Sequence, residues 1–187
     1  MRGEYVNYGK SIDKNLKKSL KYIQSSCDLN DSIGCRILGH FYEFGKGTRV
    51  DYQSAKRFYQ KSCELGNFVG CKNLAWLYQT GKGEKKDIQK AITLYEKSCN
   101  GRFVDACLNL GFIYEAGDGV AKDYKKAKKL YQKACELNSK EGCKYLAFFY
   151  EYGKGVEKDI KKAIYFYQKS CEQGLKSACT KLQEIKK

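Results

Sequence analysis

The sequence lacks several features that would point to familiar chemistry. Its 187 residues contain no proline, one tryptophan and one histidine, His40. A single histidine excludes most histidine-based catalytic sites and zinc sites, which need several such groups or partners. No apolar run approaches the roughly 20 residues of a membrane-spanning helix, so no transmembrane segment is expected. The first ten residues also lack the apolar core of a secretory signal peptide.

Positive charge and cysteine are abundant instead. Lys and Arg number 36 against 21 Asp and Glu, which gives a formal net charge of +15 at pH 7. Apolar residues make up 42% of the chain, enough to bury a core, so the composition excludes a disordered protein. Ten cysteines are typical of an oxidising compartment. We therefore expect a secreted or periplasmic protein whose signal peptide has been removed or lies outside this sequence.

An internal repeat of 36 residues organises the chain. The cysteines form two series with this spacing, and the two cysteines of each repeat are eight residues apart. A period of this length is typical of solenoid architectures. An aspartate, a tyrosine and a G-x-G tripeptide recur with the same period. The aspartates are Asp51, Asp87, Asp123 and Asp159, and the tyrosines are Tyr59, Tyr95, Tyr131 and Tyr167.

Each repeat is predicted to form two helices. Asp87 is a good N-cap, and apolar or small residues follow it at spacings of three and four, as in an amphipathic helix. A G-x-G segment ends the second helix, since glycine tolerates positive φ. The fold class is therefore all-α: an α/α solenoid of about five antiparallel helix pairs, each contacting only its neighbours. The break between the two helices contains Gly66, Gly101, Asn138 or Gly174.

Residues 1–187 are expected to form a single array. Residues 1–11 are interpreted as a remnant of a preceding repeat or an N-terminal cap, because Gly9 and Lys10 lie 36 residues before Gly45 and Lys46. On this hypothesis residues 4–10 are the tail of a preceding second helix, and the chain is a fragment of a longer array. The expected repeats are approximately 12–47, 48–83, 84–119, 120–155 and 156–187.

The two cysteines of each repeat flank the predicted helix break. Eight residues of continuous helix would separate them by about 12 Å, too far for a disulfide, whereas a turn brings them together. A bond closing so short a loop contributes roughly 2–3 kcal/mol in the chain-entropy model. Two alternatives remain open: reduced cysteines acting as small core residues, and an incomplete zinc site. The predicted bonds are Cys27–Cys35, Cys63–Cys71, Cys99–Cys107, Cys135–Cys143 and Cys171–Cys179.

These repeated residues resemble the Sel1-like repeat family, which is TPR-like. The shared pattern is D-x-x-x-A-x-x-x-Y-x-K-[SA]-C-x7-C-x-x-L-[GA]-x-x-Y-x-x-G-x-G, and it extends over nearly the whole chain from about residue 12. More narrowly, the chain is similar to the Helicobacter cysteine-rich protein group, whose 36-residue units carry paired cysteines eight residues apart. The resemblance implies a secreted or periplasmic protein. It also implies either an adaptor that holds partner proteins or a penicillin-binding protein with weak β-lactamase activity.

The residues themselves do not support an enzyme. A serine β-lactamase requires S-x-x-K together with S-D-N and K-T-G elements. One S-x-x-K is present, Ser11 to Lys14, and neither of the other elements occurs. We therefore expect no catalytic residue, no metal and no cofactor. Binding or hydrolysis of a β-lactam or peptidoglycan-like ligand is implied by the resemblance alone.

Residues at one repeat position form a column along a solenoid, and one column is basic. It is placed on the polar face of the first helices, which usually line the concave side of such arrays. The stripe would attract an unidentified protein, an acidic peptide or an anionic envelope polymer. Nucleic acid is disfavoured, because no recognised motif is present. The alternative is a solvated face that keeps the array soluble. The basic stripe comprises Lys61, Lys97, Lys133, Lys169, Lys90, Lys126 and Lys162, joined by Arg57 and Lys129.

A second column, on the second helices, is aromatic. Its position points roughly away from the core face, so exposed rings there would mark a partner surface. The alternative is that the rings pack between neighbouring second helices. Both columns favour a monomeric, disulfide-stapled binding scaffold with no chemistry of its own. The aromatic column comprises His40, Trp76, Phe112 and Phe148.

Overall fold

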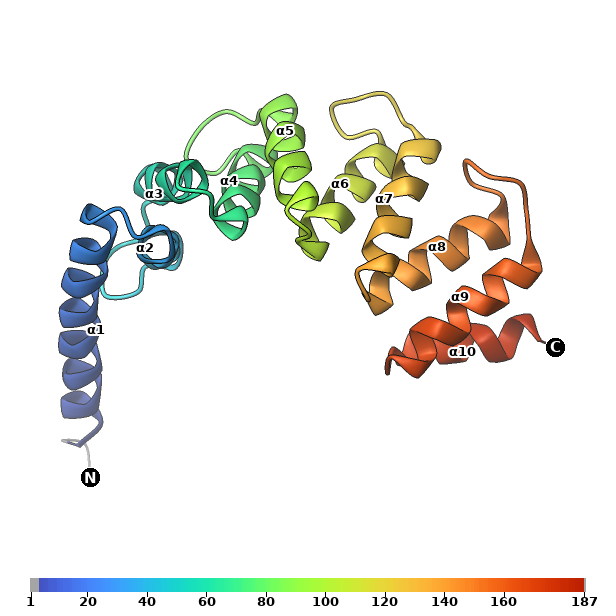
Figure 1. The fold of residues 1–187 in the computed structure, drawn as a ribbon. Coiled ribbons are helices and arrows are strands. Elements are labelled where there is room, and N and C mark those ends of the chain that lie inside the picture. Colours follow the sequence, from blue (N-terminus) through green and yellow to red (C-terminus); the bar gives the residue numbers. More distant parts are fainter. Residues whose placement is uncertain (1–3, 187) are drawn as a thin grey trace. The chain divides into compact units, whose positions relative to one another are not determined.

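The computed structural model describes the backbone of residues 4–186 and the side chains of residues 15, 16 and 18–186. The described residues form ten α-helices and no strand (Figure 1), which confirms the predicted all-α solenoid of helix pairs. The helices are α1 (Glu4–Asp28), α2 (Ser32–Phe44), α3 (Tyr52–Glu64), α4 (Phe68–Thr80), α5 (Ile88–Asn100), α6 (Val104–Ala116), α7 (Tyr124–Glu136), α8 (Lys140–Tyr152), α9 (Ile160–Glu172) and α10 (Lys176–Ile185).

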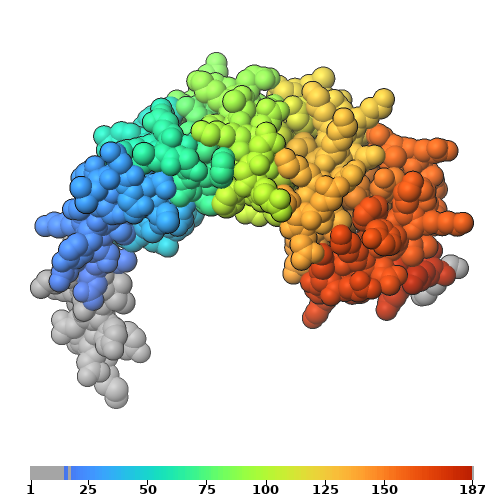
Figure 2. All heavy atoms as spheres, in the orientation of Figure 1, coloured from blue at the N-terminus to red at the C-terminus, as the bar shows by residue number. Residues whose placement is uncertain are grey.

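The chain divides into two compact units, which we call the N-terminal unit (Met1–Leu94) and the C-terminal unit (Tyr95–Lys187). In the N-terminal unit α1 packs on α2, α2 on α3 and α3 on α4. In the C-terminal unit the same sequential packing runs from α6 to α10. Figure 2 shows this order on the surface of each unit, where segments consecutive in the chain lie next to one another. Helices therefore pack mainly against their neighbours in the chain, as in other repeat proteins.

The repeated aspartates begin the first helices, as the sequence predicts. The Asp51 carboxylate accepts the backbone N–H of Ser54 at 3.1 Å, and Asp87 accepts that of Lys90 at 3.0 Å. Asp123 and Asp159 make the same bond at 2.9 Å to Lys126 and Lys162. Each carboxylate satisfies an N–H group that has no partner within the helix, which stabilises the first turn.

The G-x-G tripeptide has a different role at each glycine. Gly153 ends α8 in the left-handed conformation, with φ 68°. Gly155 also has a positive φ, and a Cβ atom added to it would lie 2.5 Å from the carbonyl carbon of Tyr124 at the start of α7. The first glycine is needed for the turn and the second for close backbone approach.

Five disulfides join the two helices of every repeat. They are the pairings that the sequence predicts, and the Cα atoms of Cys27 and Cys35, for example, lie 4.4 Å apart. In the third repeat the left-handed residue between the helices is Arg102, with φ 67°, whereas the sequence indicated Gly101. The repeat position fixes this conformation, because Asn30, Gly66, Asn138 and Gly174 occupy it elsewhere. An arginine can hold this strained conformation because the disulfide-linked helices fix the chain on both sides of the turn.

Three of the four repeated tyrosines link one repeat to the next. Tyr59, Tyr95, Tyr131 and Tyr167 are the largest fully buried side chains. The hydroxyl of Tyr131 donates to Glu115 at 2.8 Å and that of Tyr167 to Glu151 at 2.6 Å, and Tyr59 donates to Glu43 in the same way. In each case the carboxylate lies on the second helix of the preceding repeat. Burial and the adjacent carboxylate raise the pKa of these three tyrosines, so their hydroxyls stay protonated and keep donating.

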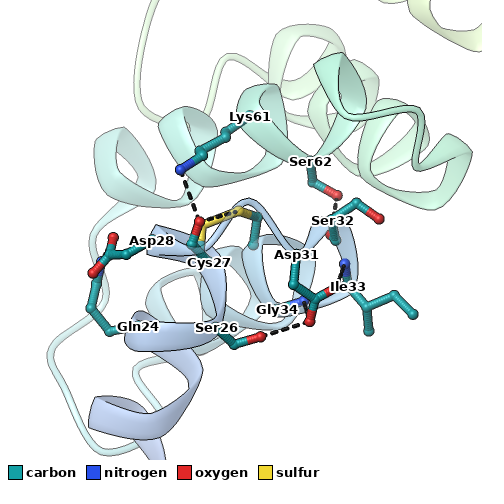
Figure 3. Close-up of a disulfide and its surroundings, with 11 residues drawn as sticks. Gln24, Ser26, Cys27, Asp28, Asp31, Ser32, Ile33, Gly34, Lys61 and Ser62 are labelled. Atoms are coloured by element: carbon teal, nitrogen blue, oxygen red, sulfur yellow. Dashed lines mark hydrogen bonds between the residues drawn. A yellow bond between two sulfur atoms is a disulfide. The ribbon is translucent and has the colours of Figure 1, made fainter.

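A second link joins the disulfide-bearing ends of neighbouring repeats. The Ser62 hydroxyl of α3 donates to the backbone carbonyl of Ser32 at 2.7 Å (Figure 3). Ser170 of α9 makes the equivalent bond to Lys140 at 2.7 Å. Both serines are fully buried, which leaves no room for water to replace the bond. Adjacent repeats are therefore fixed by hydrogen bonds in addition to apolar packing.

The N-terminal segment differs from expectation. Residues 4–10 do not form the end of a separate second helix but belong to α1, which continues without a break to Asp28. Serine, at position 11, stands where the other repeats have the second glycine of G-x-G. The segment therefore lacks the glycine that allows close backbone approach, and the helix continues through it.

Removing one disulfide should cost a large part of the stability of its repeat. In Cys63→Ala/Cys71→Ala, we expect the free energy of unfolding to fall by about 2–3 kcal/mol, because the unfolded chain regains the entropy of a short open loop. Urea unfolding followed by circular dichroism measures this change. Intact mass before and after reduction counts the disulfides, because each gains two hydrogens, and an unchanged mass would contradict their presence.

The tyrosine–glutamate link should also be measurable. Tyr59→Phe leaves the carboxylate of Glu43, which is only 9% exposed, without this donor. We expect the free energy of unfolding to fall by about 1–3 kcal/mol, because the buried acceptor loses its hydrogen bond. Tyr165→Phe is the matched control, since Tyr165 is 61% exposed. An equal effect of both substitutions in urea unfolding would rule out the special role of Tyr59.

Candidate functional site

Five lysines of the basic stripe fall into two groups with different surroundings. Lys90 and Lys162 lie in the first turn of α5 and α9, where their ammonium groups pair with Asp87 and Asp159 at 3.1 Å. Lys126 pairs with Asp123 in the same way at 3.9 Å. The backbone N–H of Lys90, and then its side chain, hold the pKa of Asp87 below its usual value. These lysines remain about 60% exposed, so a partner can reach them.

The other group reaches back to the preceding repeat. The Lys61 ammonium donates to the backbone carbonyl of Cys27 at 2.8 Å (Figure 3), and Lys133 donates to the Asn100 side chain at 2.9 Å. Cys27 and Asn100 lie at the ends of α1 and α5, where a cation is favourable next to the free carbonyls of the last turn. Lys61 and Lys133 therefore hold successive first helices together besides carrying charge.

Positive charge is concentrated on the first helices of the pairs. Helices α3, α5, α7 and α9 contain thirteen Lys and Arg residues and four Glu residues. Helices α2, α4, α6 and α8 contain four basic and five acidic residues. The excess charge of the chain is thus borne largely by one helix of each pair. This asymmetry is stronger than a surface needs for solubility alone, since mixed charges serve that purpose.

A hollow of about 360 Å³ opens on the most basic of these helices, in the C-terminal unit. Leu110, Tyr114 and Leu130 supply apolar surface, and the ammonium groups of the basic stripe stand beside them. The hollow combines an apolar patch with positive charge, which suits an acidic ligand that also carries an apolar group. Its lining comprises Glu96, Cys99, Asn100, Leu110, Tyr114, Lys126, Lys129, Leu130 and Lys133.

The aromatic column is packed on one side and accessible on the other. Phe112 of α6 makes an edge contact with Tyr145 of α8, with ring centroids 5.0 Å apart, yet it remains 37% exposed. Phe148 contacts Tyr152 of its own helix at 4.6 Å. His40, Trp76 and Phe148 are half-buried. The rings therefore contribute to packing between second helices without being fully covered.

Lysines of the G-x-G segments cover part of this column, which the sequence reasoning missed. Lys82 lies over the Trp76 ring at 4.3 Å and Lys154 over the Phe148 ring at 4.5 Å, both within range of a cation–π interaction. The Lys46 ammonium lies 3.2 Å from the Nε2 atom of His40. Burial, followed by Lys46, lowers the pKa of His40. The sequence does indicate these lysines, because the tripeptide is G-K-G in three of its four copies.

The structure supports no function for the other sites considered from the sequence. The side chains of Ser11 and Lys14 lie outside the described residues. Among the side chains that are described, no group of three or more His, Cys, Asp or Glu residues is placed to hold a metal ion. No helix in the described part of the chain is both long and apolar enough to cross a membrane.

Helices α2 to α9 are each 13 residues long, a disulfide closes every helix pair, and buried hydrogen bonds join neighbouring pairs within each compact unit. These features define an α/α repeat protein. The family model of the Sel1 repeat matches five segments, which together include most of the sequence: residues 2–31, 32–67, 69–102, 104–139 and 140–175. The chain belongs to the Sel1 repeat family. From the second match on, each match pairs a second helix with the first helix that follows it, whereas our expected repeats pair the two disulfide-linked helices.

Solved structures show the same architecture. A Sel1 repeat protein from Oxalobacter formigenes is 28% identical, with a TM-score of 0.77, over 92% of this chain and 73% of that chain. A protective antigen of uropathogenic Escherichia coli with an SLR fold is 26% identical, with a TM-score of 0.84, over 89% of this chain and 36% of that one. Helicobacter pylori cysteine rich protein B is 35% identical, with a TM-score of 0.55, over 68% and 92%. A search of curated proteins gives no match.

The two roles of the basic stripe can be separated by substitution. We expect Lys61→Gln to lower the free energy of unfolding by about 1 kcal/mol, because it loses a charged hydrogen bond to the end of α1. Lys129→Gln should change it by less than about 0.5 kcal/mol, since Lys129 is exposed on α7. Urea unfolding of both variants tests this difference, and equal values would contradict it.

Proposed function

We propose that this protein is a secreted or periplasmic binding scaffold whose first helices hold an acidic segment of a partner protein. Sel1 repeat proteins generally mediate protein interactions, which supports the scaffold role. The observation that carries the choice of partner is the concentration of positive charge on α3, α5, α7 and α9. A surface of one sign speeds the encounter with partners of the opposite sign and disfavours like-charged ones.

The hollow on α7 supports a peptide over a simple polyanion. Leu110, Tyr114 and Leu130 offer an apolar floor, which a chain of sugars or phosphates would not use. Lys126 and Lys129 stand at the same hollow, so an apolar side chain flanked by Asp or Glu would satisfy both parts. The fitting segment is therefore acidic with at least one buried apolar anchor, the usual combination in peptide recognition.

The disulfides support a location of the protein outside the cytoplasm. All ten cysteines are paired, and such bonds persist in oxidising compartments while reducing agents in the cytosol remove them. The chain also resembles Helicobacter pylori cysteine rich protein B, whose name records the same abundance of cysteine. The bonds would also keep the binding helices rigid, which lowers the entropy cost of holding a partner.

Binding of an acidic peptide should depend on the charges at the hollow. We expect a fluorescent peptide with one leucine between aspartates to bind at low salt, and Lys126→Gln/Lys129→Gln to weaken binding about three- to tenfold. The affinity of the native protein should fall steeply as salt rises, because screening weakens exposed ion pairs. Fluorescence anisotropy at two salt concentrations measures both effects.

The matched control is Lys72→Gln/Lys140→Gln, which removes two charges from second helices. Equal weakening by this variant, or an affinity that does not respond to salt, would show that the first helices are not the binding surface. Turnover of a chromogenic β-lactam by the disulfide-intact protein would contradict a scaffold with no chemistry of its own.

A further inference from the structure

A second cavity, of about 390 Å³, lies on the second helices of the C-terminal unit, mainly between α8 and α10. It is separate from the basic hollow, with which it shares no residue. Its size is within the range of small-molecule sites. The lining residues are Glu115, Lys144, Tyr145, Phe148, Tyr167, Ser177 and Lys181.

The preceding repeat shows what fills the equivalent space. Tyr145 of α8 lies beside the buried Tyr131, with ring centroids 5.1 Å apart, and beside Phe112 at 5.0 Å. Its ring thus occupies the corner between α6, α7 and α8. In the two repeats before it, Asn73 and Asn109 stand at this position and hydrogen-bond the buried tyrosines Tyr59 and Tyr95. In these three repeats, the residue at this position contacts the buried tyrosine.

One repeat later the ring is missing. Phe148 and Tyr167 stand 36 residues after Phe112 and Tyr131, but Lys181 stands where Tyr145 would recur. The Lys181 ammonium pairs with Glu184 of its own helix at 2.8 Å. The space beside Phe148 and Tyr167 is the second cavity, so the cavity lies where Tyr145 places its ring one repeat earlier.

The charged groups around the cavity favour a negatively charged ligand. The Glu115 carboxylate accepts bonds from Tyr131 and from Lys154, at 2.8 and 3.2 Å, so its negative charge is already compensated. Lys181 is paired with Glu184. Lys144 lies over the Tyr145 ring at 4.8 Å, at the edge of the cavity, where its ammonium can meet an incoming anion.

We propose that this cavity binds a planar aromatic ring carrying a carboxylate. The ring takes the place that Tyr145 has in the preceding repeat, against Phe148 and Tyr167, where offset or edge contacts between rings are favourable. The carboxylate pairs with Lys144. The same chemistry can come from a free aromatic acid or from a tyrosine next to an acidic residue in a partner peptide.

Titration of the full chain by ¹H–¹⁵N NMR tests the proposal with defined probes. We expect 3-(4-hydroxyphenyl)propionate to shift the amide signals of Lys144, Phe148 and Ser177 with a Kd on the order of 1 mM, as for a small fragment. 4-Ethylphenol lacks the carboxylate and cyclohexanepropionate lacks the aromatic ring, so both should bind at least about threefold more weakly. A capped Asp-Tyr-Asp peptide forms the second arm: shifts with the peptide identify a partner side chain as ligand, and shifts with the acid alone identify a free acid.

Two substitutions separate binding from folding. Lys181→Tyr supplies the missing ring, so we expect at least tenfold weaker binding with an unchanged or higher midpoint of thermal unfolding. Lys144→Gln should weaken binding of the acid about three- to tenfold and leave 4-ethylphenol unaffected. Lys72→Gln removes the charge at the same repeat position in α4 and is the matched control. Equal binding by Lys181→Tyr and the native chain, or no shift with either probe, would overturn the proposal.

Discussion

The structure depends on a tight turn that is closed by a covalent bond. Eight residues separate the paired cysteines, and within them each first helix ends, the chain reverses through one left-handed residue, and the second helix begins. Because the two helix ends are joined there, every helix pair presents the same faces to its neighbours. The buried tyrosines and serines then find a carboxylate or a carbonyl at the same place in the adjoining repeat. Regular hydrogen bonds between repeats follow from the fixed geometry within them.

Positive charge is distributed unevenly over this regular framework. The first helices carry most of the basic residues, while the second helices are nearly balanced. Some of these cations serve two purposes, because Lys61 and Lys133 also hold the ends of preceding helices. A binding surface built in this way is not independent of the fold. The residues that attract a partner also help to position the helices that receive it.

The features that recur in every repeat could be predicted from the sequence, whereas those that differ between repeats could not. The period, the aspartate caps and the cysteine pairs could be found because identical residues recur every 36 positions. The tyrosine–glutamate link was missed because Gln79 interrupts the glutamate series Glu43, Glu115 and Glu151. The turn at Arg102 was missed because the neighbouring glycine gave a stronger local signal. The second cavity could not be predicted, because only the packing around Tyr145 shows what fills the equivalent place one repeat earlier.

The contact of Gly155 with the backbone at the start of α7 has a consequence for how such chains diversify. A Cβ atom added to Gly83 would likewise lie 2.9 Å from the backbone of Tyr52, so the end of a repeat touches its own beginning. Four residues after each such glycine, the next capping aspartate donates its backbone N–H to the second helix just completed, as Asp87 does to Tyr78 at 2.9 Å. A residue inserted between the glycine and the aspartate would break either the backbone contact of the glycine or the hydrogen bond of the aspartate. New specificities in this scaffold must therefore arise by exchanging side chains at fixed positions, and not by lengthening loops.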